Sequence, residues 1–230
     1  MNPQNLPAVL REVRARMARA AAAAGRSAHS VTLLAVGKAQ PLELLAAAAD
    51  CGVTDFGESY LQEALAKMAA LRSRTLTWHF IGRIQANKTR PIAEAFSWVH
   101  ALDRTKVAER LAAQRPREAP PLNVCLEVNI AGEASKGGVM PELLPDLAAA
   151  VAHLPRLTLR GLMCIPPEES EPARQRAWFA RLRGLRDDLN AAGYSLDTLS
   201  MGMSADFEAA IEEGATIVRL GTVLFGARPR

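Results

Sequence analysis

The feature that most constrains the fold is a regular alternation of short apolar segments with longer helix-like segments. Each apolar segment leads into a polar or glycine-containing loop and then into a stretch rich in alanine, leucine and arginine. Strands that are separated by a helix pair in parallel through right-handed crossovers, because a tight hairpin joins only antiparallel strands. The expected strands are Val31–Val36, Val53–Phe56, Thr77–Ile81, Trp98–Ala101, Leu122–Val128, Leu159–Met163, Thr198–Ser200 and Ile217–Leu220.

A helical segment fills every gap between these strands. The expected helices are Pro41–Asp50, Glu58–Leu71, Asn87–Ala95, Arg104–Gln114, Pro141–His153, Pro172–Ala192 and Ala205–Glu213. Eight such units in 230 residues predict an α/β protein with a single closed (β/α)8 barrel of the TIM type. An open doubly wound sheet is the alternative. Such a sheet usually carries a glycine-rich dinucleotide loop after its first strand, whereas residues 37–41 read GKAQP, with one glycine.

An extra amphipathic helix precedes the first strand, over Pro3–Ala24, with apolar residues at spacings of three and four. No segment is long and polar enough to act as a linker, so we expect one domain over residues 1–230.

Composition narrows the class of protein further. The formal net charge is +4, but the arginines are scattered and aromatic residues make up only 5%, which does not favour nucleic-acid binding. No run approaches the roughly 20 apolar residues of a membrane span, and residues 1–4 do not resemble a targeting segment, so a cytoplasmic protein is expected. Cys51, Cys125 and Cys164 lack the spacing of a zinc site and are expected to be reduced and buried.

The active site of such a barrel lies at the carboxyl ends of the strands. Lys38 directly follows the first strand and is therefore the first candidate for a functional residue. Desolvation in the barrel mouth would favour the neutral amine, which attacks carbonyl groups. The alternative is an ordinary solvated or salt-bridged lysine on a loop.

Phosphate groups in barrels are commonly held by the loops after strands seven and eight. Ser200 and Ser204 follow the seventh expected strand, whereas Arg219, Gly221 and Thr222 end the eighth. Hydroxyls, backbone N–H groups and an arginine from two adjacent loops therefore predict an anion site. Either serine taken alone is more often a helix cap.

The remaining polar candidates receive structural interpretations. His79 alternates with Trp78 and Phe80 and is interpreted as a hydrogen-bonded histidine that lines the barrel rather than as a catalytic base. Glu58 is interpreted as a carboxylate at a helix start, no partner is expected for His100, and no ATP-binding loop or metal site is expected.

Taken together, these residues resemble the pyridoxal-phosphate-binding homeostasis proteins of the YggS/PROSC type. The resemblance extends over nearly the whole chain through LLAVGK (33–38), FGESYLQE (56–63), WHFIG (78–82), QANK (85–88), EVNI (127–130), RGLM (160–163), LSMGMS (199–204) and VRLGT (218–222). It implies a barrel similar to the N-terminal domain of alanine racemase and an internal aldimine between Lys38 and pyridoxal 5′-phosphate. It also implies that the cofactor phosphate and ring are held by Ser200, Met201, Ser204, Arg219, Gly221 and Thr222.

Two positions depart from that family's usual pattern. Gly37 stands where the family usually has serine, and Ser59 stands where it usually has asparagine. We therefore expect the affinity for the cofactor to differ from the family norm.

The resemblance implies a carrier or buffer in intracellular pyridoxal phosphate homeostasis, with little or no catalytic turnover. Its partners would be pyridoxal phosphate and apo forms of pyridoxal-phosphate-dependent enzymes, and a monomer is expected. One alternative is a low-activity amino-acid racemase in which Lys38 doubles as a base. The other is a Schiff-base sugar-phosphate enzyme, in which the phosphate belongs to the substrate.

Overall fold

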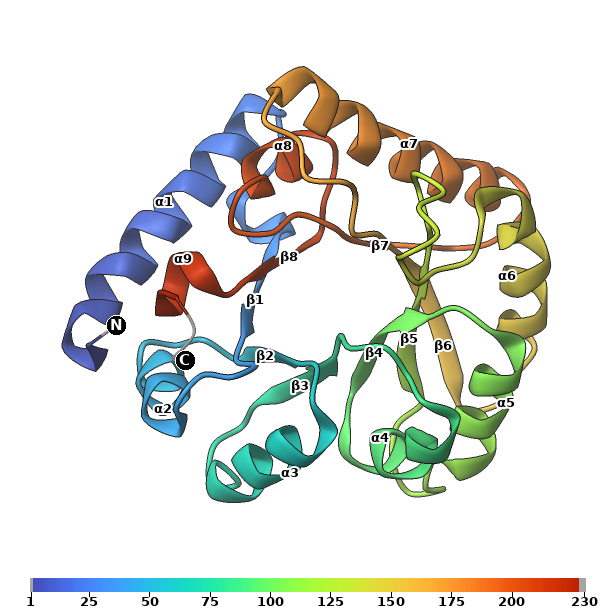
Figure 1. Ribbon diagram of the computed structural model, residues 1–230, viewed down its shortest axis with the longest axis horizontal. Coiled ribbons are helices and arrows are strands. Elements are labelled where there is room, and N and C mark those ends of the chain that lie inside the picture. The colour runs from blue at the N-terminus through green and yellow to red at the C-terminus, as the bar shows by residue number, and fades with distance from the viewer. Residues whose placement is uncertain (1, 228–230) are drawn as a thin grey trace.

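The computed structural model describes residues 2–227, so Met1 and residues 228–230 of the expected domain lie outside the described part. Eight parallel strands close into a barrel in sequence order, with helices around the outside (Figure 1). The strands are β1 (Thr32–Val36), β2 (Asp55–Glu58), β3 (Thr77–Phe80), β4 (Trp98–Leu102), β5 (Leu122–Glu127), β6 (Leu157–Met163), β7 (Thr198–Ser200) and β8 (Ile217–Leu220). The predicted (β/α)8 barrel with an extra N-terminal helix is confirmed.

The outer layer follows the expected alternation. Its α-helices are α1 (Leu6–Ala23), α2 (Leu42–Asp50), α3 (Leu61–Ala70), α4 (Thr89–Ala95), α5 (Thr105–Gln114), α6 (Leu144–Ala152), α7 (Pro172–Ala191), α8 (Phe207–Glu212) and α9 (Thr222–Phe225). Short 3-10 helices cover Pro3–Asn5, Ala28–Ser30, Ala86–Lys88 and Pro141–Leu143.

The second unit differs most from the sequence prediction. β2 covers Asp55–Glu58 instead of Val53–Phe56, and α3 begins only at Leu61. The pairing with β3 runs on to Glu58, which lies opposite Phe80. The interpretation of Glu58 as a helix-start carboxylate is therefore wrong, because this residue ends a strand and its side chain is fully buried.

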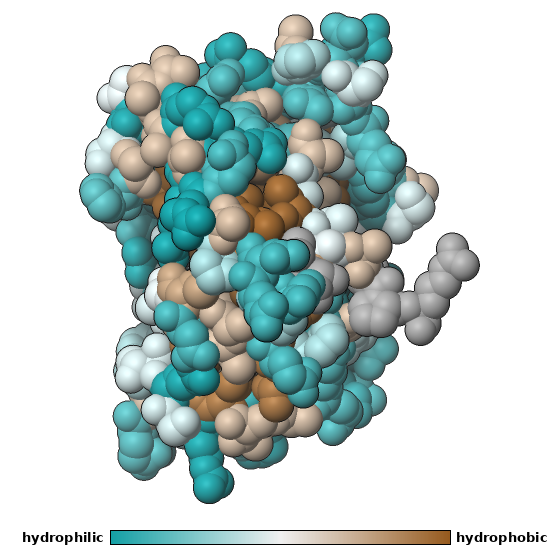
Figure 2. Space-filling model, turned by 90° about the vertical axis from the view of Figure 1, so that its left-hand side faces the viewer, coloured by the Kyte–Doolittle hydropathy of each residue, from teal (hydrophilic) through white to brown (hydrophobic). Residues whose placement is uncertain are grey.

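Helix α1 completes the outer layer where the barrel closes. The helix after β8, α9, has only four residues, and α1 packs against α2, α8 and α9 beside the β1–β8 seam (Figure 1). Leu6, Leu10, Val13 and Met17 form its buried stripe, at the spacing expected for one helix face. Hydrophilic residues cover much of the molecular face seen in Figure 2, which fits an amphipathic helix whose other side meets solvent.

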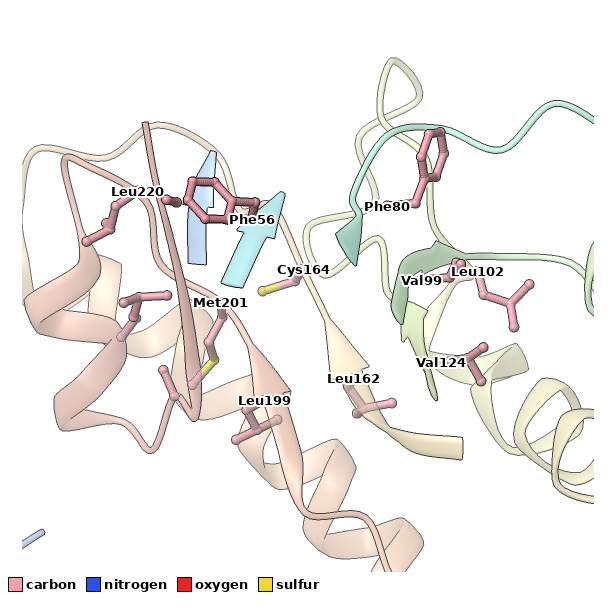
Figure 3. Close-up of a cluster of buried hydrophobic side chains, with 14 of the residues drawn as sticks. Phe56, Phe80, Val99, Leu102, Val124, Leu162, Cys164, Leu199, Met201 and Leu220 are labelled. Carbon is pink, nitrogen blue, oxygen red and sulfur yellow. The ribbon is translucent and has the colours of Figure 1, made fainter. Parts of the chain in front are cut away.

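The main hydrophobic core lies between the strands and the helices. Figure 3 shows part of this cluster, to which Leu162 and Cys164, two positions apart on and after β6, contribute apolar side chains. The strands approach one another closely at Gly161, where an added Cβ would lie 1.8 Å from the backbone oxygen of Thr198. Glycine is therefore required for the pairing of β6 with β7.

Candidate functional site

The backbone around Lys38 is held on both sides by one helix. From α3, Lys67 Nζ donates a hydrogen bond to the carbonyl oxygen of Gly37 at 2.7 Å. The amide of Ala39 donates to Glu63 Oε1 at 2.8 Å. Ala39 has a φ of 56°, a left-handed conformation that non-glycine residues adopt only when their surroundings enforce it. Lys38 is thus presented from a fixed loop at the carboxyl end of β1.

A buried carboxylate lies directly behind this loop. Glu58 is 0% exposed, and its Oε1 accepts a hydrogen bond from Lys67 Nζ at 2.9 Å, while Lys67 also pairs with Glu63. Its Oε2 has no hydrogen-bond partner in the described part of the chain. Burial raises the pKa of Glu58 from 4.5 to about 7, against the opposing effects of Lys67 and the positive charge of Lys38.

Gly37 makes room for this carboxylate. A Cβ at position 37 would lie 2.6 Å from Glu58 Oε1 and 2.8 Å from a methyl group of Leu45. In this chain, any side chain at position 37 would therefore require the side chains of Glu58 and Leu45 to shift.

The structure brings Lys38 together with the loop after β8. A small pocket at the barrel rim is lined by Val36, Lys38, Gln40, Gly221 and Thr222. The loop after β7 joins the same region, because the amide of Val223 donates to Ser204 Oγ at 3.2 Å. Lys38, Ser204, Gly221 and Thr222 therefore come from three loops that meet at the carboxyl end of the barrel.

Arg219 is buried and joins the ends of three strands. Its Nη1 donates to the backbone oxygen of Ser200 at 2.6 Å and to Ser200 Oγ at 2.9 Å, and its Nη2 donates to the carbonyl of Cys164 at 2.9 Å. Met201 differs from the other predicted residues, because its side chain lies in the apolar cluster of Figure 3. Only the backbone of Met201 is left to contact a ligand.

Two buried histidines connect to this arginine. His79 Nδ1 lies 2.9 Å from His100 Nε2, and His100 Nδ1 lies 2.7 Å from Ser200 Oγ. His79 Nε2 lies 3.0 Å from Asp55 Oδ1, so the prediction of a hydrogen-bonded histidine lining the barrel is confirmed. No partner was predicted for His100 from the sequence. The only sequence signal for this pairing is that His100 lies on the strand that directly follows the strand of His79.

The cysteines are free, as expected. Cys125 and Cys164 are buried, and burial raises the pKa of each thiol to about 12, which leaves them unreactive. Cys51 is only partly buried, contrary to the prediction, because it caps the end of α2.

Within residues 2–227, no group of three or more His, Cys, Asp or Glu side chains could hold a metal ion. In the same range, no helix is long and apolar enough to cross a membrane.

Fold and site together define a single-barrel protein with a lysine at the end of β1, facing a rim built from the loops after β7 and β8. The family model described as "Alanine racemase, N-terminal domain" matches residues 10–229, and the chain belongs to this family. Among curated relatives, the pyridoxal phosphate homeostasis protein of Pseudomonas aeruginosa is 61% identical over 217 residues, which cover 94% of this chain and 93% of the relative. The protein of the same name from Escherichia coli K12 is 48% identical, with 95% of each chain covered.

Solved structures agree with this assignment. PipY of Synechococcus elongatus, determined with PLP bound, is 37% identical and superimposes with a TM-score of 0.79 over 86% of this chain and 93% of PipY. Alanine racemase of Corynebacterium glutamicum is 17% identical, with a TM-score of 0.69 over 98% of this chain and 62% of the racemase. That second likeness shows the shared barrel fold alone.

Proposed function

We propose that this chain binds pyridoxal 5′-phosphate covalently through Lys38 and serves as a carrier and buffer of the cofactor, with little or no catalytic turnover. The observation that carries the proposal is the meeting of Lys38 with Gly221 and Thr222 in one rim pocket. The names of the relatives and the PLP-bound PipY structure support the same ligand.

The chemistry of the donor set fits this ligand. When bound, pyridoxal phosphate supplies an aldehyde, a phosphate and an electron-accepting ring. Lys38 offers the amine for the aldehyde, and the phosphate is assigned to the hydroxyls and N–H groups of Ser204, Gly221 and Thr222. We assign the ring and phosphate also to Ser200, Arg219 and the backbone of Met201, where Arg219 donates to the backbone oxygen and the hydroxyl of Ser200.

Glu58 is suited to hold the proton that Lys38 must lose before it can attack an aldehyde. Its Oε2 has no partner within residues 2–227, and its pKa, which burial raises to about 7, allows proton exchange near neutral pH. Lys67 keeps Glu58 Oε1 and the Gly37 carbonyl in place during that exchange. Loading and release of the cofactor then depend on groups within a single chain.

Two features support a carrier over a racemase, because a racemase would need a second acid or base in addition to Lys38. Glu58 has no exposed surface, so it serves Lys38 rather than an α-carbon of a bound amino acid. Tyr60, in the loop between β2 and α3, is 57% exposed to solvent. A base for a substrate must lie within hydrogen-bond reach of the proton that it removes.

The proposal includes a location and a partner. We place the protein in the cytoplasm as a monomer whose open rim releases the cofactor to apo forms of pyridoxal-phosphate-dependent enzymes.

A transfer experiment tests this function. The protein loaded with pyridoxal phosphate is mixed with an apo-enzyme of that class, and the activity gained by the enzyme is followed over time. Restored activity, without deuterium incorporation from heavy water at the α-carbon of alanine by the loaded protein alone, supports a carrier. Rapid deuterium incorporation would instead support the racemase alternative.

A further inference from the structure

A continuous chain of hydrogen bonds crosses the inside of the barrel. It runs from Asp55 through His79 and His100 to Ser200 and ends at Arg219. We call Asp55, His79, His100 and Ser200 the lumen relay. His100 lies on β4 and Ser200 on β7, with β5 and β6 between them in the barrel, so their bond spans the lumen rather than joining neighbouring strands.

The relay connects the two ends of the barrel. Asp55 is the first residue of β2 at the amino end, whereas Ser200 is the last residue of β7 at the carboxyl end. The Asp55 side chain is 23% exposed and lines a cavity at the amino end together with Arg14 and Thr54. The side chains further along the relay are at most 1% exposed, namely those of His79, His100 and Ser200.

The chemistry of the two ends fixes the direction of every bond. Arg219 can only donate, and an ionised Asp55 can only accept. His79 therefore donates from Nε2 to Asp55, and its unprotonated Nδ1 accepts from His100 Nε2. His100 Nδ1 then accepts from the Ser200 hydroxyl, whose oxygen accepts from Arg219 Nη1.

The surroundings keep both histidines neutral, as this direction requires. Burial lowers the pKa of His79, and burial together with His79 and the Arg219 charge lowers the pKa of His100 well below 6.5. Burial alone would raise the pKa of Asp55, but hydrogen bonds from His79 and Thr54 outweigh it and keep the group ionised.

No other acid bonds to the relay within residues 2–227. Burial lowers the pKa of Arg219, whereas Asp206 and Glu127 act on its charge without a hydrogen bond and raise that pKa against the effect of burial. His79 stacks on Trp98 with 5.5 Å between the ring centroids, and the Arg160 guanidinium, bound to Asp197, lies over the same indole at 5.1 Å. Asp55 is thus the anionic end of a relay that is otherwise formed by neutral groups.

We propose that Asp55, His79 and His100 are positioning residues of the cofactor site, which hold Ser200 and Arg219 in one orientation through a one-directional relay anchored by a carboxylate at the opposite end of the barrel. This inference rests on the proposed function, because it takes Arg219 to face the cofactor. A chain of bonds that all point the same way polarises its members cooperatively, so the distant carboxylate strengthens the hold on Arg219.

The direction of the relay can be measured on the unmodified, cofactor-free protein. Nitrogen-15 NMR of the imidazoles distinguishes protonated from unprotonated ring nitrogens. We expect both His79 and His100 to carry their proton on Nε2 at pH 7. A proton on Nδ1 of either ring, or an imidazolium at either position, would overturn the proposal whether or not the protein binds pyridoxal phosphate.

The effect on the site is measured by titrating pyridoxal phosphate into the wild type, Asp55→Asn, His100→Phe and His153→Gln. His153 is an exposed histidine at the end of α6 and serves as the control. We expect His100→Phe to weaken binding by about tenfold, because Ser200 loses its acceptor.

Asp55→Asn keeps the size and the acceptor atom but removes the charge. We expect it to move the pH midpoint of the visible band of the bound cofactor to lower pH. Loss of the charge at the far end weakens the polarisation of the relay, so the site stabilises a protonated cofactor less well. An unchanged affinity in His100→Phe together with an unchanged midpoint in Asp55→Asn would overturn the proposal. A wild type that binds no pyridoxal phosphate would refute the proposed function instead, and the NMR result would still stand.

Discussion

Replacing Glu58 with glutamine should change how the stability of the cofactor-free protein depends on pH. The carboxylate is fully buried and its pKa in the folded protein is raised by burial to about 7, compared with 4.5 for the ordinary group. Well below pH 4.5 the group is protonated in both states and has no effect. As the pH rises from 4.5 to 7, the unfolded chain loses this proton more readily than the folded protein, so the wild type loses stability.

The size of the effect follows from the two pKa values. A pKa difference of one corresponds to about 1.4 kcal/mol, so the interval from 4.5 to about 7 corresponds to a loss of about 3 kcal/mol that is complete above pH 7. In Glu58→Gln the new amide would keep an oxygen that accepts from Lys67 and nearly the same volume, but it cannot ionise. The variant should therefore gain about 3 kcal/mol relative to the wild type between pH 4 and pH 8.

Urea unfolding of both proteins at a series of pH values measures this difference directly. Only a pH-dependent change in the stability difference between the two proteins tests the argument. A stability difference that is the same at every pH reports packing alone. Curves that stay parallel from pH 4 to pH 8 would refute the reasoning, since they would mean that Glu58 titrates alike in the folded and unfolded states.

Three further predictions concern the site and the barrel. Lys38→Ala should abolish the label that borohydride fixes to the protein, yet retain weaker, phosphate-dependent binding of pyridoxal phosphate; an undiminished fixed label would contradict this. Thr222→Ala should weaken retention of the cofactor by about tenfold, the effect of one hydrogen bond to a charged group, whereas unchanged affinity by equilibrium dialysis would place the phosphate elsewhere. Gly161→Ala should destabilise the protein by about 3 kcal/mol, because its Cβ would lie 1.8 Å from a carbonyl oxygen of β7. Gly184→Ala, within α7 and with no atom within 4 Å of the added Cβ, is the matched control and should stabilise by about 0.5–1 kcal/mol in the same denaturation assay.

The fold could be predicted because one sequence pattern dictates it. Alternating strands and helices require parallel pairing, and parallel pairing places every strand's carboxyl end on the same side of the sheet. That argument alone placed Lys38, Gly221 and Thr222 at one end of the barrel, where the structure joins them in a pocket.

The missed features depend on side chains that meet only after the barrel closes. The hold of Glu63 and Lys67 on the backbone around Lys38 requires the position of α3 relative to β1. The bond between His100 and Ser200 requires two strands on opposite sides of the lumen, 100 positions apart in sequence. Strand periodicity carries no information about which distant residues face each other across a barrel.

The bounds of β2 were wrong for a different reason. A charged residue after a glycine is usually read as the start of a loop or helix, whereas here Glu58 stays on the strand because Lys67 compensates its charge.

The visible absorption spectrum of the purified protein, before and after addition of pyridoxal phosphate, followed by borohydride reduction and peptide mapping, tests the central claim most directly. The account predicts a visible band that reduction abolishes, with the cofactor then fixed to the peptide that contains Lys38. A protein that gains no band, or a label fixed to another lysine, would contradict it and would return the barrel with a sugar-phosphate substrate to consideration.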